Sequence, residues 1–108
     1  MTDSQPTISV QQAVSLRDNP EVLFLDVRED DEVAFCKIAG SLHIPMAEIA
    51  ERLPHLPKEK RIIVYCHHGM RSWHVCQFLS SKGYAQVQNL AGGIDAWSCE
   101  IDSSVQRY

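Results

Sequence analysis

The sequence lacks the patterns that mark several common classes of protein. None of its four cysteines belongs to a Cys-x-x-Cys pair, so a tetrahedral zinc site has little support. Its ten lysines and arginines are scattered and its net charge is −4, so nucleic acid is not an expected partner. No apolar run approaches the roughly 20 residues that a membrane span needs. What is left is an ordinary globular composition, 44% hydrophobic and 22% charged.

The length and the first residues set further limits. A chain of 108 residues fits one domain, so we expect a disordered N-terminus over residues 1–6 and a single domain over residues 7–108. The first six residues contain neither the basic stretch nor the apolar stretch of a signal peptide. We therefore expect a cytoplasmic protein whose cysteines stay reduced.

Short apolar runs alternate with helical patterns along the chain. Strands are predicted at residues 7–10, 22–25, 40–45, 62–65 and 86–90. Helices are predicted at residues 11–17, 29–37, 47–53, 73–82 and 92–97. This alternation indicates an α/β fold with a mostly parallel sheet, in which ligands bind beyond the carboxyl ends of the strands.

One loop at such a strand end carries a cysteine. Cys66 follows the apolar run 62–65 and precedes a predicted helix. Backbone N–H groups in a loop of this kind, together with the helix N-terminus, favour a negative charge and therefore an activated thiolate. The alternative is a buried cysteine that acts as a small apolar residue. The short, polar or glycine residues that follow favour the first interpretation, so Cys66 is the candidate catalytic residue.

Four residues late in this loop are candidate substrate-binding residues. Gly69 allows a tight turn that brings the backbone amides inward, including that of Met70. Arg71 either points its guanidinium toward an anion or braces the carbonyls of the loop, and the sequence does not decide between these roles. Ser72 is a good helix N-cap whose hydroxyl is also able to reach the sulfur.

Two adjacent histidines complete the set of candidate substrate-binding residues. Either one of His67 and His68 holds a partly protonated imidazole near an anionic substrate, or both simply face solvent. With Cys66 and His74 they also suggest a metal cluster. Because adjacent side chains of a tight loop are expected to diverge and helical spacing turns His74 away, we expect no metal site.

Four further residues have mainly structural interpretations. Asp26 and Arg28 follow the neighbouring apolar run, where they either pair with each other or support the cysteine loop. Trp73 and Trp97 are expected to be packing residues rather than parts of a ligand cage.

Four motifs, taken together, resemble a single-domain rhodanese, a sulfurtransferase. They occur in the order of that family and cover most of residues 7–98: Leu25-Asp26-Val27-Arg28-Glu29, Ile38-Ala39-Gly40-Ser41 with Ile44-Pro45, Val64-Tyr65-Cys66-His67-His68-Gly69-Met70-Arg71-Ser72 and Leu90-Ala91-Gly92-Gly93-Ile94-Asp95-Ala96-Trp97. The chain is similar to the rhodanese domains that are fused to adenylyltransferases acting on sulfur-carrier proteins. The tail 102–108 adds to this similarity.

The resemblance implies both a fold and a reaction. The fold is a five-stranded, mostly parallel sheet flanked by helices on both faces. The reaction is transfer of a sulfane sulfur from thiosulfate or a protein persulfide, through a persulfide on Cys66, to a thiol or a sulfur-carrier protein, without any cofactor. The chain departs from the family pattern at Cys36-Lys37, where Gly-His is common, and its loop lacks the extra basic residues of some relatives that use thiosulfate. Thiosulfate is therefore expected to be a poor natural donor.

Two other functions remain open from the sequence. A cysteine phosphatase also places a Cys-to-Arg loop before a helix, but that family has five residues between the two, whereas four separate Cys66 from Arg71. A non-catalytic module that binds or regulates a partner through this fold is the other alternative. The intact cysteine in a well-formed loop favours the enzyme.

Overall fold

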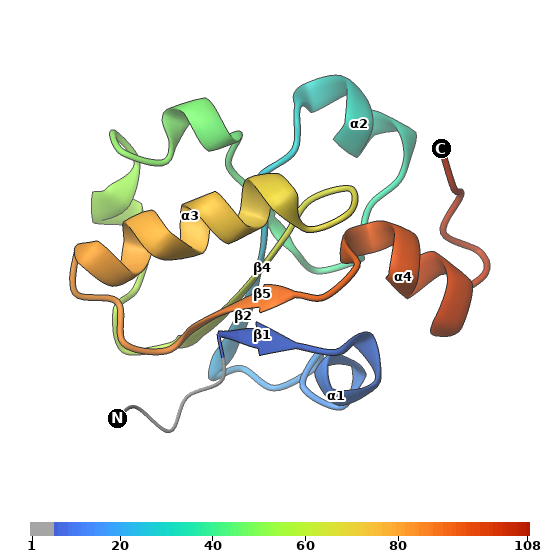
Figure 1. Ribbon diagram of the computed structural model, residues 1–108, viewed down its shortest axis with the longest axis horizontal. Coiled ribbons are helices and arrows are strands. Elements are labelled where there is room, and N and C mark those ends of the chain that lie inside the picture. The colour runs from blue at the N-terminus through green and yellow to red at the C-terminus, as the bar shows by residue number, and fades with distance from the viewer. Residues whose placement is uncertain (1–5) are drawn as a thin grey trace.

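The computed structural model describes residues 6–108, whose strands form one sheet (Figure 1). The strand order is β1-β5-β4-β2-β3, and every strand pair is parallel. The strands are β1 (Thr7–Ile8), β2 (Val22–Asp26), β3 (Leu42–His43), β4 (Arg61–Tyr65) and β5 (Val87–Leu90). The helices are α1 (Val10–Val14), α2 (Asp30–Phe35), α3 (Met70–Ser81) and α4 (Gly93–Glu100). The predicted α/β fold with a five-stranded parallel sheet and helices on both faces is confirmed.

Alternating side chains of the central strands feed two separate cores. On β4, Ile62 and Val64 point to one face of the sheet, and Ile63 and Tyr65 point to the other. All four are fully buried, because both faces of a parallel sheet are covered. This explains why the strand is a continuous apolar run in the sequence.

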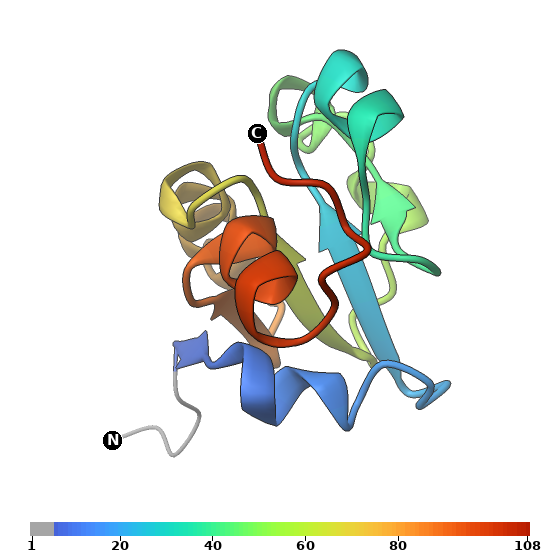
Figure 2. The ribbon, with the colours of Figure 1, turned by 90° about the vertical axis from the view of Figure 1, so that its right-hand side faces the viewer.

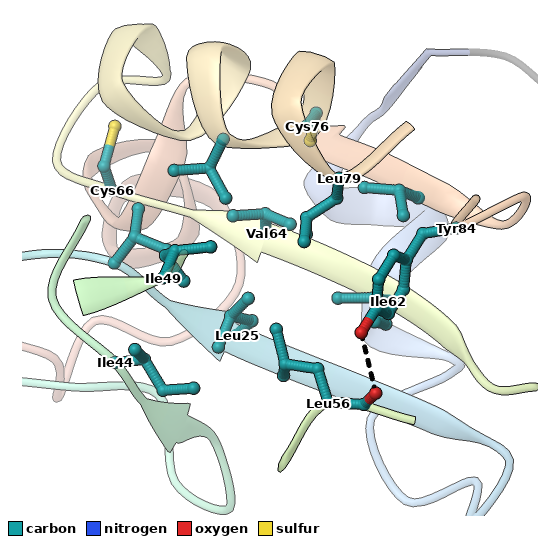
Figure 3. Packing of buried hydrophobic residues seen from close by; sticks show 13 residues of the cluster. Leu25, Ile44, Ile49, Leu56, Ile62, Val64, Cys66, Cys76, Leu79 and Tyr84 are labelled. Atoms are coloured by element: carbon teal, nitrogen blue, oxygen red, sulfur yellow. Dashed lines mark hydrogen bonds between the residues drawn. The ribbon is translucent and has the colours of Figure 1, made fainter. Parts of the chain in front are cut away.

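The first core lies beneath α3, whose apolar face packs on the sheet (Figure 3). Burying one apolar side chain contributes about 1.5–3 kcal/mol to the free energy of folding, so the apolar face of α3 holds this helix on the sheet. Its edge is closed by Tyr84, whose hydroxyl donates a hydrogen bond to the carbonyl of Leu56 (2.8 Å). The second core lies on the opposite face, under α1 and α4, where the Trp97 ring meets that of Phe24 edge-on at 5.9 Å.

Several predicted helices are shorter than expected. α2 ends at Phe35 rather than at residue 37 because Cys36 has an extended backbone and its carbonyl is taken by the guanidinium of Arg28 (2.6 Å). α1 ends at Val14 rather than at residue 17. The predicted helix at residues 47–53 is instead divided between two short 3₁₀ turns, Met46–Glu48 and Leu53–His55. Pro54 removes a backbone donor that a longer α-helix would need.

The N-terminal prediction falls mostly outside the described residues. Of residues 1–6, only Pro6 is described, and its carbonyl accepts a hydrogen bond from the N–H of Asn89 (2.9 Å). Within residues 6–108, no helix has both the length and the apolar character required to cross a membrane.

Candidate active site

The loop between β4 and α3 lies at the carboxyl edge of the sheet, as predicted. Cys66 directly follows β4 and is 1% exposed. Its sulfur is directed toward the start of α3 (Figure 3). The neighbouring strand β2 ends beside it, since Asp26 is in register with Tyr65. The topology therefore brings the two strand ends singled out in the sequence to one place.

Three hydrogen-bond donors surround the sulfur of Cys66. The backbone N–H of Gly69 lies 3.1 Å from Sγ, and the N–H and the hydroxyl of Ser72 each lie 3.4 Å from it. Burial raises the pKa of the thiol, but these hydrogen bonds and the positive charge of Arg71 outweigh it, so the pKa is lowered. The predicted setting for an activated thiolate is present.

Asn89, at the end of β5, ties the two sides of the loop together. Its side-chain amide donates to the carbonyl of Gly69 (3.0 Å), and its oxygen accepts from the hydroxyl of Ser72 (2.5 Å). The sequence analysis did not identify this residue. The available signal was a polar side chain inside a short, otherwise buried strand, because an asparagine that is 6% exposed must find hydrogen-bond partners.

The N-terminus of α4 holds the first half of the loop. The N–H of Ile94 donates to the carbonyl of Cys66 (2.9 Å), and the N–H of Asp95 donates to that of His67 (3.1 Å). The loop approaches so closely that a Cβ added to Gly93 would lie 2.5 Å from each of these carbonyl oxygens. Because these two carbonyls are hydrogen-bonded to α4, the backbone N–H groups of the loop point to the opposite side, toward the sulfur.

The guanidinium of Arg71 points toward an anion, one of the two alternatives from the sequence, and this anion is a carboxylate of the protein itself. The guanidinium forms a bidentate ion pair with Glu32 of α2, with Nη1–Oε1 at 2.7 Å and Nη2–Oε2 at 2.9 Å. The ion pair raises the pKa of Arg71. It is also the largest cause that lowers the pKa of Glu32, to about 2. The sequence analysis did not identify Glu32 as a partner of the loop.

The two histidines lie together rather than diverging, so that expectation was wrong. The ring centroids of His67 and His68 are 3.9 Å apart, and the ring of Tyr108 stacks on His67 at 3.8 Å. His68 and Asp95 approach to 3.9 Å, and one ligand atom from each of His67, His68 and Asp95 lies within 4.8 Å of the others. Asp95 is already paired with Arg107 (2.9 Å), so its carboxylate would have to leave that ion pair to bind an ion.

Asp26 and Arg28 form a buried ion pair, the first of the two alternatives predicted. Nη2 of Arg28 lies 2.7 Å from Oδ2 of Asp26, and both side chains are at most 1% exposed. The guanidinium also donates to the carbonyl of Cys36 and to the hydroxyl of Tyr108 (3.0 Å). The pair thus holds the end of α2 and the tail of the chain beside the loop.

An open pocket of about 530 Å³ borders the loop on its other side. Its lining consists of His68, Gly69, Met70, Trp73, Asn89 and Gly92. Met70 is 71% exposed and Trp73 is 44% exposed. The expectation that Trp73 is a packing residue was wrong, because its ring lies at this surface, whereas Trp97 is fully buried as predicted. His74 is exposed on the outer face of α3, as predicted.

Comparison with known proteins agrees with this architecture. The family model described as "Rhodanese-like domain" matches residues 9–100. A sulfurtransferase of Allochromatium vinosum is 40% identical over 83 residues, which cover 77% of this chain and 78% of the relative. The thiosulfate sulfurtransferase GlpE of Coxiella burnetii is 35% identical over 97 residues, which cover 90% of this chain and 91% of the relative.

A solved structure shows the same fold. The crystal structure of a rhodanese-related protein from Thermoplasma volcanium matches with a TM-score of 0.82 at 33% identity, covering 90% of this chain and 94% of that one. The resemblance found in the sequence is confirmed, and the chain belongs to the family of rhodanese-like domains.

Proposed function

We propose that the protein is a sulfurtransferase in which Cys66 carries a sulfane sulfur as a persulfide. The observation that carries the proposal is the set of three donors around Sγ, namely the backbone N–H groups of Gly69 and Ser72 and the hydroxyl of Ser72. Donors fixed in this way stabilise a negative charge on sulfur without reorganising, as an oxyanion hole does on oxygen. The names of the relatives, sulfurtransferase and thiosulfate sulfurtransferase, support the same chemistry.

The reaction proceeds in two transfers. The Cys66 thiolate attacks the outer sulfur of thiosulfate or of a protein persulfide and forms a new S–S bond. The old S–S bond breaks, and its electron pair leaves with sulfite or with the donor thiolate. A nucleophilic acceptor (cyanide, a thiol or a sulfur-carrier protein) then attacks the outer sulfur of Cys66 and restores the thiolate. Covalent catalysis thus divides one difficult transfer into two easier ones, and neither step needs a metal or an organic cofactor.

The loop residues have separate roles in this scheme. The amides from His67 to Ser72 hold the anionic persulfide at the N-terminus of α3, where the helix dipole favours negative charge. His68, Gly69 and Met70 border the pocket through which donor and acceptor approach. Arg71 contributes positive charge, which is shared with Glu32. We place the reaction in the cytoplasm, because reducing conditions keep the cysteines as free thiols.

Intact-mass measurement tests the proposal. Incubation with thiosulfate or with a cysteine-desulfurase persulfide is expected to add one sulfur atom, and cyanide is expected to remove it. The Cys66→Ala variant should gain no sulfur, whereas Cys99→Ala, which changes an exposed cysteine, should behave like the wild type. Absence of the gain with every donor would support a binding module instead. Phosphate-ester hydrolysis that disappears in Cys66→Ser would support a phosphatase.

A further inference from the structure

The carboxylate of Glu32 is held by more donors than a surface glutamate normally has. Its Oε1 accepts from the N–H of Glu29 (3.1 Å) and from Nη1 of Arg71 (2.7 Å). Its Oε2 accepts from Nη2 of Arg71 (2.9 Å) and from the hydroxyl of Tyr108 (2.7 Å). Only 16% of the side chain is exposed. Four hydrogen bonds therefore fix both oxygens and keep the group ionised at neutral pH.

The supports of Glu32 are themselves anchored. The buried guanidinium of Arg28 donates to the backbone carbonyl of Glu32 (3.3 Å) and to the hydroxyl of Tyr108 (3.0 Å). The ring of Tyr108 stacks on His67 and meets Phe35 edge-on. In Figure 2 the C-terminal segment passes α4 and ends beside α2. The carboxylate consequently cannot swing away from Arg71 without breaking a connected set of contacts.

This arrangement controls the charge near the sulfur. Arg71 is close enough to Cys66 for its positive charge to lower the pKa of the thiol. The bidentate contact with Glu32 offsets most of that charge toward an incoming anion. Arg107, beside the loop histidines, is offset in the same way by Asp95 (2.9 Å). A sulfur donor that approaches the loop therefore meets arginines that are already paired with carboxylates, and not an excess of positive charge.

We propose that Glu32 is a positioning residue that sets donor specificity: by holding Arg71, it makes the site favour persulfide donors over thiosulfate. The inference rests on the proposed sulfur transfer through Cys66. Thiosulfate carries two negative charges and must approach a thiolate, so attack of the Cys66 thiolate on its outer sulfur needs positive charge that is not already paired. The outer sulfur of a persulfide brings at most one negative charge, so paired charges at the loop penalise it less.

Kinetics with two donors test this inference. The ratio of kcat/KM for thiosulfate to kcat/KM for glutathione persulfide is measured for the wild type, Glu32→Gln and Asp31→Asn. Glu32→Gln keeps the shape of the side chain but removes its charge, and it should raise the ratio about tenfold, as expected for one unit charge at a partly exposed site. Asp31→Asn makes the same charge change on an exposed residue of the same helix and should leave the ratio within about twofold. Added salt should reduce the effect of Glu32→Gln.

A second variant separates specificity from folding. Tyr108→Phe removes one donor to Glu32 but keeps the stacking ring, so it should shift the ratio in the same direction by a smaller factor. It also removes an acceptor of Arg28, so its circular dichroism spectrum at the assay temperature should show that the protein is still folded. An unchanged or lowered ratio in folded Glu32→Gln overturns the inference, as does an equal ratio change in Asp31→Asn. If wild-type protein accepts sulfur from neither donor, the proposed function itself has failed, which is a distinct result.

Discussion

Replacing Arg28 by methionine tests how the region behind the loop is held. The guanidinium is fully buried and forms an ion pair with Asp26. It also donates hydrogen bonds to the carbonyl of Cys36 and to the hydroxyl of Tyr108. Methionine fills much of the space of the arginine stem but supplies no donor. The variant leaves the carboxylate of Asp26, which is 1% exposed, without its counter-charge.

The magnitude follows from that burial. Removing one partner of a buried ion pair costs about 3–5 kcal/mol, because the remaining charge stays desolvated. Since a domain of this size has a total stability of about 5–15 kcal/mol, Arg28→Met should lose a large fraction of its free energy of unfolding. Replacing both residues, in Asp26→Asn/Arg28→Met, removes the stranded charge and should recover part of the loss.

Urea denaturation followed by circular dichroism measures the free energy of unfolding. Arg52→Met is the matched control, because Arg52 forms an exposed ion pair with Glu48 (3.3 Å) and should cost no more than about 1 kcal/mol. A loss below about 1 kcal/mol in Arg28→Met, or a double variant less stable than Arg28→Met, would refute the reasoning.

Two further predictions concern the loop itself. Gly93→Ala should destabilise the protein by more than Gly40→Ala in the same urea assay; both glycines have positive φ, but only at Gly93 would a Cβ meet backbone, 2.5 Å from the Cys66 carbonyl. Equal losses would show that the close approach does not matter. Ser72→Ala removes a donor to the sulfur and should raise the pKa of Cys66, so the pH profile of iodoacetamide alkylation should move to higher pH, while Ser80→Ala on the same helix leaves it unchanged. A profile that stays in place in Ser72→Ala would mean that the backbone amides alone stabilise the thiolate.

The parts of the site that are local in sequence were predictable. The apolar run before Cys66 and the glycine after it determine a strand, a turn and a helix, and parallel pairing places Asp26 beside Tyr65. Strand alternation follows from a period of two and needs no knowledge of the tertiary structure.

The parts that depend on distant contacts were not predictable. The partner of Arg71 is Glu32, 39 positions away, and the ring that stacks on His67 belongs to Tyr108 in a tail without a helical or strand period. Local patterns carry no information on such pairs. The short 3₁₀ turns at residues 46–55 show a different limit, because apolar spacing of three or four residues does not distinguish them from an α-helix.

The position of Ser72 between Cys66 and Asn89 has a consequence for the reaction cycle. Its hydroxyl has one hydrogen but two acceptors, Sγ at 3.4 Å and Oδ1 of Asn89 at 2.5 Å. A neutral thiol is a weak acceptor, so the hydroxyl then donates its hydrogen bond to Oδ1 of Asn89. A thiolate is a much stronger acceptor, so the hydroxyl then donates to Sγ of Cys66. A change in the charge on Sγ is thus accompanied by rotation about the Cβ–Oγ bond of Ser72. Gain or loss of the proton on Sγ of Cys66 is therefore matched by the position of one hydroxyl hydrogen of Ser72.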